Sequence, residues 1–222
     1  MPNYLVRLRL PDRPGALGAV ASRIGSVGAD VVSIDILQRD RGVVIDELGV
    51  GLEGEHLLDL MRDEILEVDG VTIESVRTLE GPVPDRYAEL LEVATELFTQ
   101  SSPADLIRHL VLRVRRNLAA SFAVVLDAAT RAVRASDGQV PDPAELAAMA
   151  RLASEPAGPG QSRSPRTDLA VTDEARAVAV SEMDRTGSIL LVGRRDPVLR
   201  DRERQWIAIM AELADHRAHE LS

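Results

Sequence analysis

The residues best suited to hold a ligand form a short run near the start of the chain, Asp12-Arg13-Pro14-Gly15-Ala16-Leu17. Pro14 fixes φ near the helical value and lacks the N–H that a helix start leaves unpaired. Gly15 allows another group to approach the backbone closely. A helix that begins here presents its first N–H groups at the positive end of its dipole. The run therefore predicts an anion site for a carboxylate or phosphate, with a simple loop-to-helix turn as the alternative.

The elements on either side of this run are predicted by hydrophobic periodicity. Residues 4–10 alternate between apolar side chains on one face and Arg7 and Arg9 on the other, which predicts a half-buried strand. Apolar residues at helical spacing predict a helix over 15–27. The run thus lies in the turn between a strand and a helix.

A β-hairpin is predicted to follow the helix. Residues 30–38 are rich in β-branched side chains, and Val32, Ile34 and Ile36 face one way. After a tight turn, residues 43–52 form the expected hairpin partner.

The end of this first region predicts one more helix and one more strand. Asp46 and Glu47 weaken the prediction of the preceding strand, and we expect no acid–base chemistry from them. A second helix opens at 53–55, and a last strand follows over 71–79. The order βαββαβ predicts an α+β, ferredoxin-like unit with both helices on one face of an antiparallel sheet.

The run at 12–17, together with Gly28-Ala29-Asp30-Val31 at the start of the second strand, resembles the ACT domain. The resemblance covers residues 1–80. It implies a regulatory module that binds a small amino acid, commonly paired edge to edge with a second copy. The effector is expected between the turn after the first strand and the start of the second strand, often at the subunit interface.

Carried onto this chain, the resemblance implies ten ligand-binding residues. They are Asp12, Arg13, Pro14, Gly15, Ala16 and Leu17 on the turn side, and Gly28, Ala29, Asp30 and Val31 on the strand side. Asp30 stands where amino-acid-binding members often carry Asn. Its carboxylate can accept from an α-ammonium group and would repel an acidic effector.

A second domain is predicted after a linker. Residues 81–86 contain Gly and two prolines between two periodic regions, and residues 87–222 follow as the second domain. Helices are expected over 86–100 and from 102 onward. Residues 154–168 are rich in Ser, Pro, Gly and Arg, and a mobile loop is expected there.

The second domain resembles the GAF domain in its order of elements. Helices open it, strands follow over 121–128 and 131–136, and a late hairpin leads into a C-terminal helix that opens at Asp196-Pro197. The resemblance implies an α/β/α fold whose helices dimerise. It carries over no ligand, because there is no Cys for bilin attachment and no cyclic-nucleotide signature.

Composition limits the chemistry further. The formal net charge of −10 argues against a nucleic-acid partner, and no apolar run is long enough to span a membrane. The chain contains no Cys and no Lys, so thiol nucleophiles, Schiff bases and Walker-type phosphate loops are excluded. His216 and His219 are three residues apart, but no further ligand is near in sequence, so no metal and no cofactor are expected.

Two functions are compatible with these features. The first is a non-catalytic, cytoplasmic regulator in which a small amino acid binds the first domain and the second domain relays the bound state. The second is a dimerisation or interaction module with no small-molecule effector. Both imply a homodimer, and the first implies a protein partner whose identity is unknown.

Overall fold

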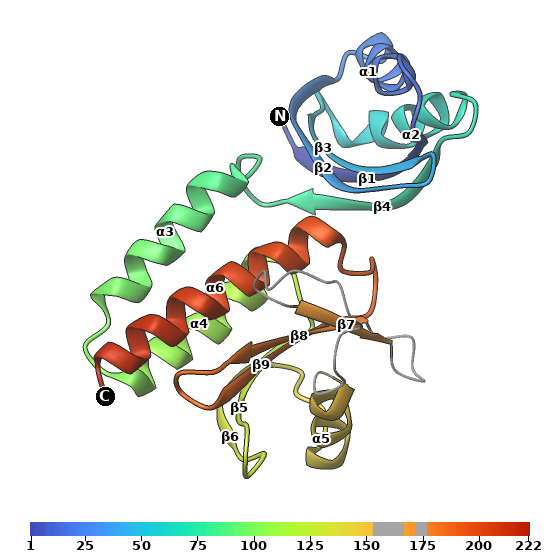
Figure 1. Ribbon diagram of the computed structural model, residues 1–222. Coiled ribbons are helices and arrows are strands. Elements are labelled where there is room, and N and C mark those ends of the chain that lie inside the picture. The colour runs from blue at the N-terminus through green and yellow to red at the C-terminus, as the bar shows by residue number, and fades with distance from the viewer. Residues whose placement is uncertain (153–166, 172–176) are drawn as a thin grey trace. The chain divides into compact units, whose positions relative to one another are not determined.

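The computed structural model describes residues 1–152, 167–171 and 177–222, which form two compact units, Met1–Arg86 and Tyr87–Ser222 (Figure 1). Within these residues, no helix combines the length and hydropathy needed to cross a membrane. Each unit has its own antiparallel sheet.

The first unit has the order βαββαβ. Its elements are β1 (Asn3–Pro11), α1 (Ala16–Ser26), β2 (Asp30–Asp40), β3 (Val43–Gly51), the 3₁₀ turn η1 (Glu55–Leu57), α2 (Leu58–Leu66) and β4 (Thr72–Leu79). All strand pairs are antiparallel, in the order β2-β3-β1-β4. This arrangement confirms the predicted α+β, ferredoxin-like class.

The core of the first unit lies between the sheet and its two helices, which cover one face (Figure 1). Alternate residues of β1, from Tyr4 to Leu10, face the helices and are fully buried. Val20 and Ile24 of α1 pack against them with Met61 and Ile65 of α2. The alternation in β1 and the helical spacing in α1 place these side chains, as the sequence predicts.

The alternation of β1 predicts that the opposite face of the sheet is open to solvent, but part of this face is covered. Arg9 is exposed, but Arg7 is only 1% exposed. Residues 81–86, predicted as a linker, run across this face: Asn3 Nδ2 donates to the Gly81 carbonyl (2.9 Å), and Val83 lies where a side chain at Gly49 would stand. Gly49 is therefore required by a close approach, which explains a glycine in the middle of a strand.

The second unit is also α+β. Its elements are α3 (Arg86–Thr99), α4 (Pro103–Asn117), β5 (Phe122–Asp127), β6 (Val133–Gly138), α5 (Pro143–Leu152), β7 (Thr167–Val171), β8 (Ala177–Met183), β9 (Ser188–Arg194) and α6 (Asp201–Glu220). The sheet order is β6-β5-β9-β8-β7. Ser102 caps α4 by accepting from the Asp105 N–H (3.1 Å), and Pro103 lies in the first turn of this helix, which begins where the sequence predicts it.

Two hydrophobic cores lie on the two faces of this sheet. Side chains of α3, α4 and α6 pack on one face against Val125, Leu190 and Val192. Leu146 and Met149 of α5 pack on the other face, against the residues of β5 and β9 that alternate with the first set, such as Val124 and Leu191. The α/β/α layering predicted from the sequence is therefore present.

Three details of the second unit differ from the sequence prediction. In α3, the apolar residues at helical spacing do not all face the core: Leu97 is buried, while Tyr87, Leu91 and Phe98 are more than half exposed. β7 was not predicted. The expected loop at 154–168 falls outside the described residues except at its last two positions, which belong to β7.

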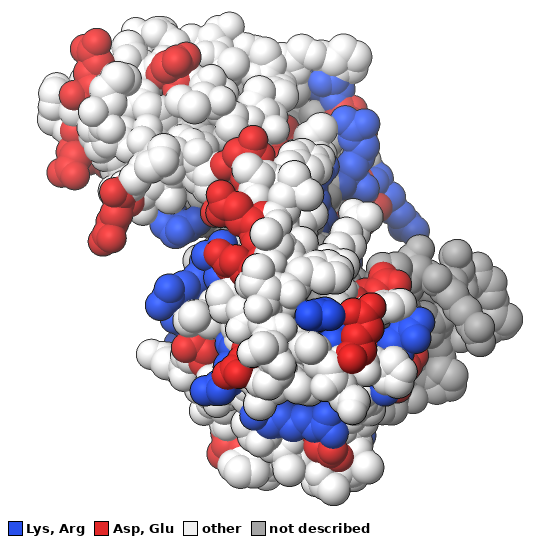
Figure 2. Space-filling model, turned by 90° about the vertical axis from the view of Figure 1, so that its left-hand side faces the viewer, with Lys and Arg blue, Asp and Glu red and all other residues white. Residues whose placement is uncertain are grey.

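Charged side chains lie in small separate groups on the face seen in Figure 2, with uncharged surface between them. No broad basic field is present on that face among the residues described.

Candidate functional site

The turn between β1 and α1 has the geometry of an uncapped helix start. Gly15 is the N-cap residue with φ 85°, and no side chain caps the helix. The Asp12 N–H donates to the Gly42 carbonyl (2.8 Å) and the Ala16 N–H to the Arg13 carbonyl (3.3 Å). A side chain at Gly15 would meet no atom within 4 Å, so the positive φ, and not lack of space, requires glycine. The turn is exposed from Asp12 to Gly15 and can be reached by an anion.

The second half of the predicted site lies where α1 ends and β2 begins. Gly28 has φ 76°, and its N–H donates to the Gly25 carbonyl (3.1 Å), which closes the last turn of the helix. Ala29 is buried in the core, whereas Asp30 is exposed at the first position of β2. Val31 packs at the edge of the core.

A single chain does not bring these two halves together. Asp30 pairs with Gly51, which also pairs with Asn3, so Asp30 lies at the start of β1. The turn at 12–17 follows Pro11 at the other end of the same strand. Eight residues of extended chain separate the two ends, roughly 26 Å. All ten predicted residues can contribute to one site only if a second copy supplies one of the halves.

The edge strand β2 presents apolar side chains that the unit does not cover. Val32, Ile34 and Ile36 are 57%, 48% and 41% exposed. Among the residues that the structure describes, β2 pairs with β3 alone, so it is an edge strand whose outer side is suited to pairing with another chain. The sequence predicts that these three side chains face the same side of the sheet. Ile34 and Ile36 do so, but irregularities in the pairing at 31–33 and 36–38 interrupt the alternation on either side of them.

Two adjacent acidic residues of β3, which weakened the strand prediction, are both buried in the structure. Asp46 is 3% and Glu47 is 6% exposed. They point to opposite faces of the sheet because side chains alternate along a strand. Two adjacent carboxylates in a predicted strand are visible in the sequence, but the sequence does not show that both are buried or which side chains contact each of them.

Glu47 has two arginine partners on the face away from the helices. Arg7, its direct neighbour on β1, donates to Oε2 (2.8 Å), and Arg86 donates to Oε1. Burial alone would raise the pKa of Glu47, but Arg86 and Arg7 outweigh burial, so the pKa is lowered from its usual 4.5. Glu47 therefore remains ionised and anchors the end of the first unit to its central strand.

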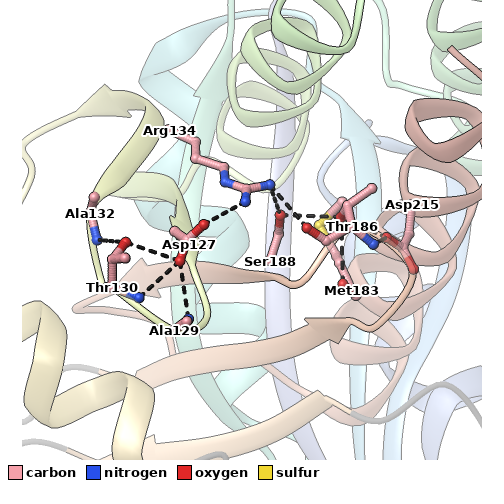
Figure 3. A network of polar contacts seen from close by, with 9 residues as sticks. All are labelled: Asp127, Ala129, Thr130, Ala132, Arg134, Met183, Thr186, Ser188 and Asp215. Carbon is pink, nitrogen blue, oxygen red and sulfur yellow. Dashed lines mark hydrogen bonds and ion pairs between the residues drawn. The ribbon is translucent and has the colours of Figure 1, made fainter. Parts of the chain in front are cut away.

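A polar network ties together three elements of the second unit (Figure 3). Asp127, at the end of β5, accepts from the N–H groups of Ala129 and Thr130 and from Arg134. Arg134 also donates to the Ser188 hydroxyl (2.8 Å) at the start of β9. These contacts hold the pKa of Asp127 well below its usual value, through the Thr130 N–H first and then Arg134.

Asp215 of α6 continues this network. It accepts from the N–H groups of Arg185 and Thr186 (both 2.9 Å) and from the Thr186 hydroxyl (2.7 Å). The β8–β9 turn is thereby attached to the C-terminal helix. Every polar group named in this network has a partner, so the network serves to hold these elements of the second unit together.

An apolar pocket lies between the helices of the second unit. Its lining includes Leu90, Val93, Val114, Ile207 and Met210. The few polar groups at it give little to orient a ligand, because specificity in a pocket comes from placed polar atoms. No group of three or more His, Asp or Glu residues in the described chain is placed to hold a metal ion.

Comparisons with known proteins give only distant likenesses. No protein-family model matches the chain. No curated protein matches it. The ACT domain from GTP pyrophosphokinase of Chlorobium tepidum aligns with 38% of this chain and 92% of its own length, at 17% identity and a TM-score of 0.29. Bacteriophytochrome RpBphP3 from R. palustris aligns with 83% of this chain at 13% identity and a TM-score of 0.45, and the chain spans 42% of its length.

These likenesses concern the arrangement of helices and strands. The assignment to the α+β class rests on the strand orders and on the layers described above.

Proposed function

We propose that this chain is a non-catalytic regulatory protein whose first unit binds a small amino acid at the β1–α1 turn. The observation that carries the proposal is the uncapped start of α1 at Gly15. The Ala16 N–H already donates to the Arg13 carbonyl, but those of Leu17 and Gly18 have no intrahelical partner and lie behind the exposed turn, so they suit the carboxylate of an amino acid.

A second copy of the chain completes the site in this proposal. If two β2 strands pair antiparallel about a two-fold axis, the start of one lies beside the end of the other. Asp40 at the end of β2 and Pro11 at the end of β1 both pair with Val43, so these two ends are close. Asp30 of one copy would therefore stand near the turn of its partner. Its carboxylate suits the ammonium group of the same ligand.

The route from the first unit to the second is short. Arg86, which Glu47 holds, is also the first residue of α3. The chain therefore passes from the last ion pair of the first unit into the first helix of the second at a single residue. This continuity supports a relay function for the second unit.

The test is a thermal-shift screen of the twenty amino acids on the full chain, followed by calorimetry with the best one. Ligand at 100 times its dissociation constant stabilises a fold by about 2.7 kcal/mol, which is a shift of several degrees for a unit of this size. Asp30→Ala should weaken binding about tenfold or more, since a hydrogen bond to a charged group is lost. Glu53→Ala, an equal change of charge near the same end of the sheet, should leave affinity unchanged.

A dimerisation module without an effector is the second candidate. The exposed apolar residues of β2 favour it, because an uncovered edge strand is suited to pairing with another chain. Dimerisation with no response to any amino acid at millimolar concentration would support this function and contradict the first.

A further inference from the structure

Asp46 is a buried carboxylate in a row of apolar side chains. The residues of β3 that face the helices are Val44, Asp46, Leu48 and Val50, and Leu8 of β1 lies directly opposite Asp46. All five are at most 6% exposed. A charged group in such a row needs a partner to offset the loss of its hydration.

Neither a hydrogen bond to its Oδ1 atom nor an ion pair among the described residues offsets this loss, although Arg39 attracts the carboxylate. The Oδ1 atom of Asp46 is buried and accepts no hydrogen bond from them. The nearby cation, Arg39, has its Nε 3.7 Å from Asp12. Burial accordingly raises the pKa of Asp46, while Arg39 lowers it and Asp12 raises it. An unsatisfied buried acceptor in a native fold calls for an explanation, and a ligand is one.

The position of Asp46 connects it to the start of α1. Val43 of β3 pairs with the last residue of β1 on one side and with the last residue of β2 on the other. Asp46 is three residues further along β3, so it lies roughly 10 Å from this end of the sheet. It lies on the face that α1 covers, and the charge of Asp12 in the turn raises the pKa of its carboxyl group, after burial and Arg39. Unlike Asp30, it therefore shares an end and a face of the sheet with Gly15 in the same chain.

The covering of Asp46 is incomplete on one side. Its neighbour on β1, Leu8, is fully buried, but its neighbour on β2, Ile36, is 41% exposed, and Ile34 is 48% exposed. A small molecule lying along this edge would meet apolar side chains and a single buried carboxylate. Such surroundings select an ammonium group attached to a carbon chain.

We propose that Asp46 binds the ammonium group of the effector, whose carboxylate lies at the start of α1 in the same chain. This inference rests on the proposed function and assigns its ammonium site to Asp46 instead of Asp30, so that Asp30→Ala would then bind the effector as tightly as the wild type. It also explains why a destabilising charge is retained in the core, since binding sites commonly break local rules of stability.

The test compares Asp46→Asn with Asp30→Asn in the full chain. Asn has the size of Asp but no charge. For Asp46→Asn we expect a higher melting temperature without ligand and a loss of affinity of about tenfold or more for any amino acid that stabilises the wild type. Asp30→Asn should retain binding. Equal affinities of Asp46→Asn and wild type, or loss of binding only in Asp30→Asn, would overturn the inference and leave the proposed function intact.

A ligand series makes the test independent of the variants. Each active amino acid is compared with the carboxylic acid that lacks its amino group and with the amine that lacks its carboxylate. The inference requires the first analogue to give no thermal shift with the wild type. A shift from the amines alone would support the ammonium site and contradict amino-acid sensing, and no shift from any compound would overturn both.

Discussion

Asp46 and Glu47 are adjacent residues with opposite electrostatic surroundings. Glu47 is ionised between two arginines, whereas Asp46 is buried on the helix-covered face with an unsatisfied oxygen. Their pKa values are accordingly shifted in opposite directions, that of Asp46 upward and that of Glu47 downward. The same kind of residue therefore has opposite effects on the stability of the first unit.

We expect Glu47→Gln to destabilise the first unit by about 3 kcal/mol or more, because it removes the carboxylate that neutralises Arg7 in a buried site. Circular dichroism should record this loss. Fluorescence of Trp206, the single tryptophan, reports on the second unit and should change little. Glu64→Gln is the matched control, because its ion pair with Arg23 is partly exposed and should contribute less than about 1 kcal/mol.

The pH dependence of the two carboxylates has opposite signs. The pKa of Glu47 is lower in the folded than in the unfolded chain, so its stabilisation is present above the usual value and is lost as the pH falls through the folded pKa. The pKa of Asp46 is raised, so the folded state gains relative stability as the pH falls and loses it as the pH rises through the folded pKa. The excess stability expected for Asp46→Asn should therefore shrink on acidification.

At the scale of elements, Asp215 joins a helix to a β-turn. It is 5% exposed and accepts three hydrogen bonds from Arg185 and Thr186. We expect Asp215→Ala to lower the free energy of unfolding of the second unit by about 3 kcal/mol, because buried donors lose a charged acceptor. Trp206 fluorescence in a denaturant titration measures this loss. Asp184→Ala, an exposed change in the same turn, should stay within about 0.5 kcal/mol of the wild type.

The local elements could be predicted because their signals are local. The alternation of β1, the helical spacing of α1 and the turn at 12–17 each depend on neighbours in sequence. The burial of Arg7 could not be predicted, because it depends on Glu47, 40 residues away, and on Arg86 at the end of the unit. For the same reason the sequence identified the turn at 12–17 but not Asp46, whose surroundings exist only after three strands pair.

At the scale of the whole molecule, the exposed edge of β2 favours association of two chains. We expect a dimer at micromolar concentration, and Ile34→Glu should convert it into a 24.1 kDa monomer by placing a charge on this edge. Ile34 is already half exposed, so the variant should remain folded. Sedimentation velocity measures the change. Leu60→Glu on α2, at the same exposure, should leave the dimer intact, and a wild-type monomer would contradict the prediction.

The segment 81–86 determines where the two units can be separated. A fragment ending at Glu80 keeps all four strands, but it loses the Asn3–Gly81 bond, the Val83 side chain over Gly49 and the Arg86 partner of Glu47. A fragment extended past Arg86 keeps all three. We expect the shorter fragment to melt at a lower temperature and to aggregate, and the longer one to remain dispersed. Circular dichroism and light scattering on the two fragments compare them directly, and equal behaviour would show that the segment is only a tether. If the expectation holds, residues 81–86 do more than connect the two units, because they also cover one face of the first unit's sheet and belong to its fold.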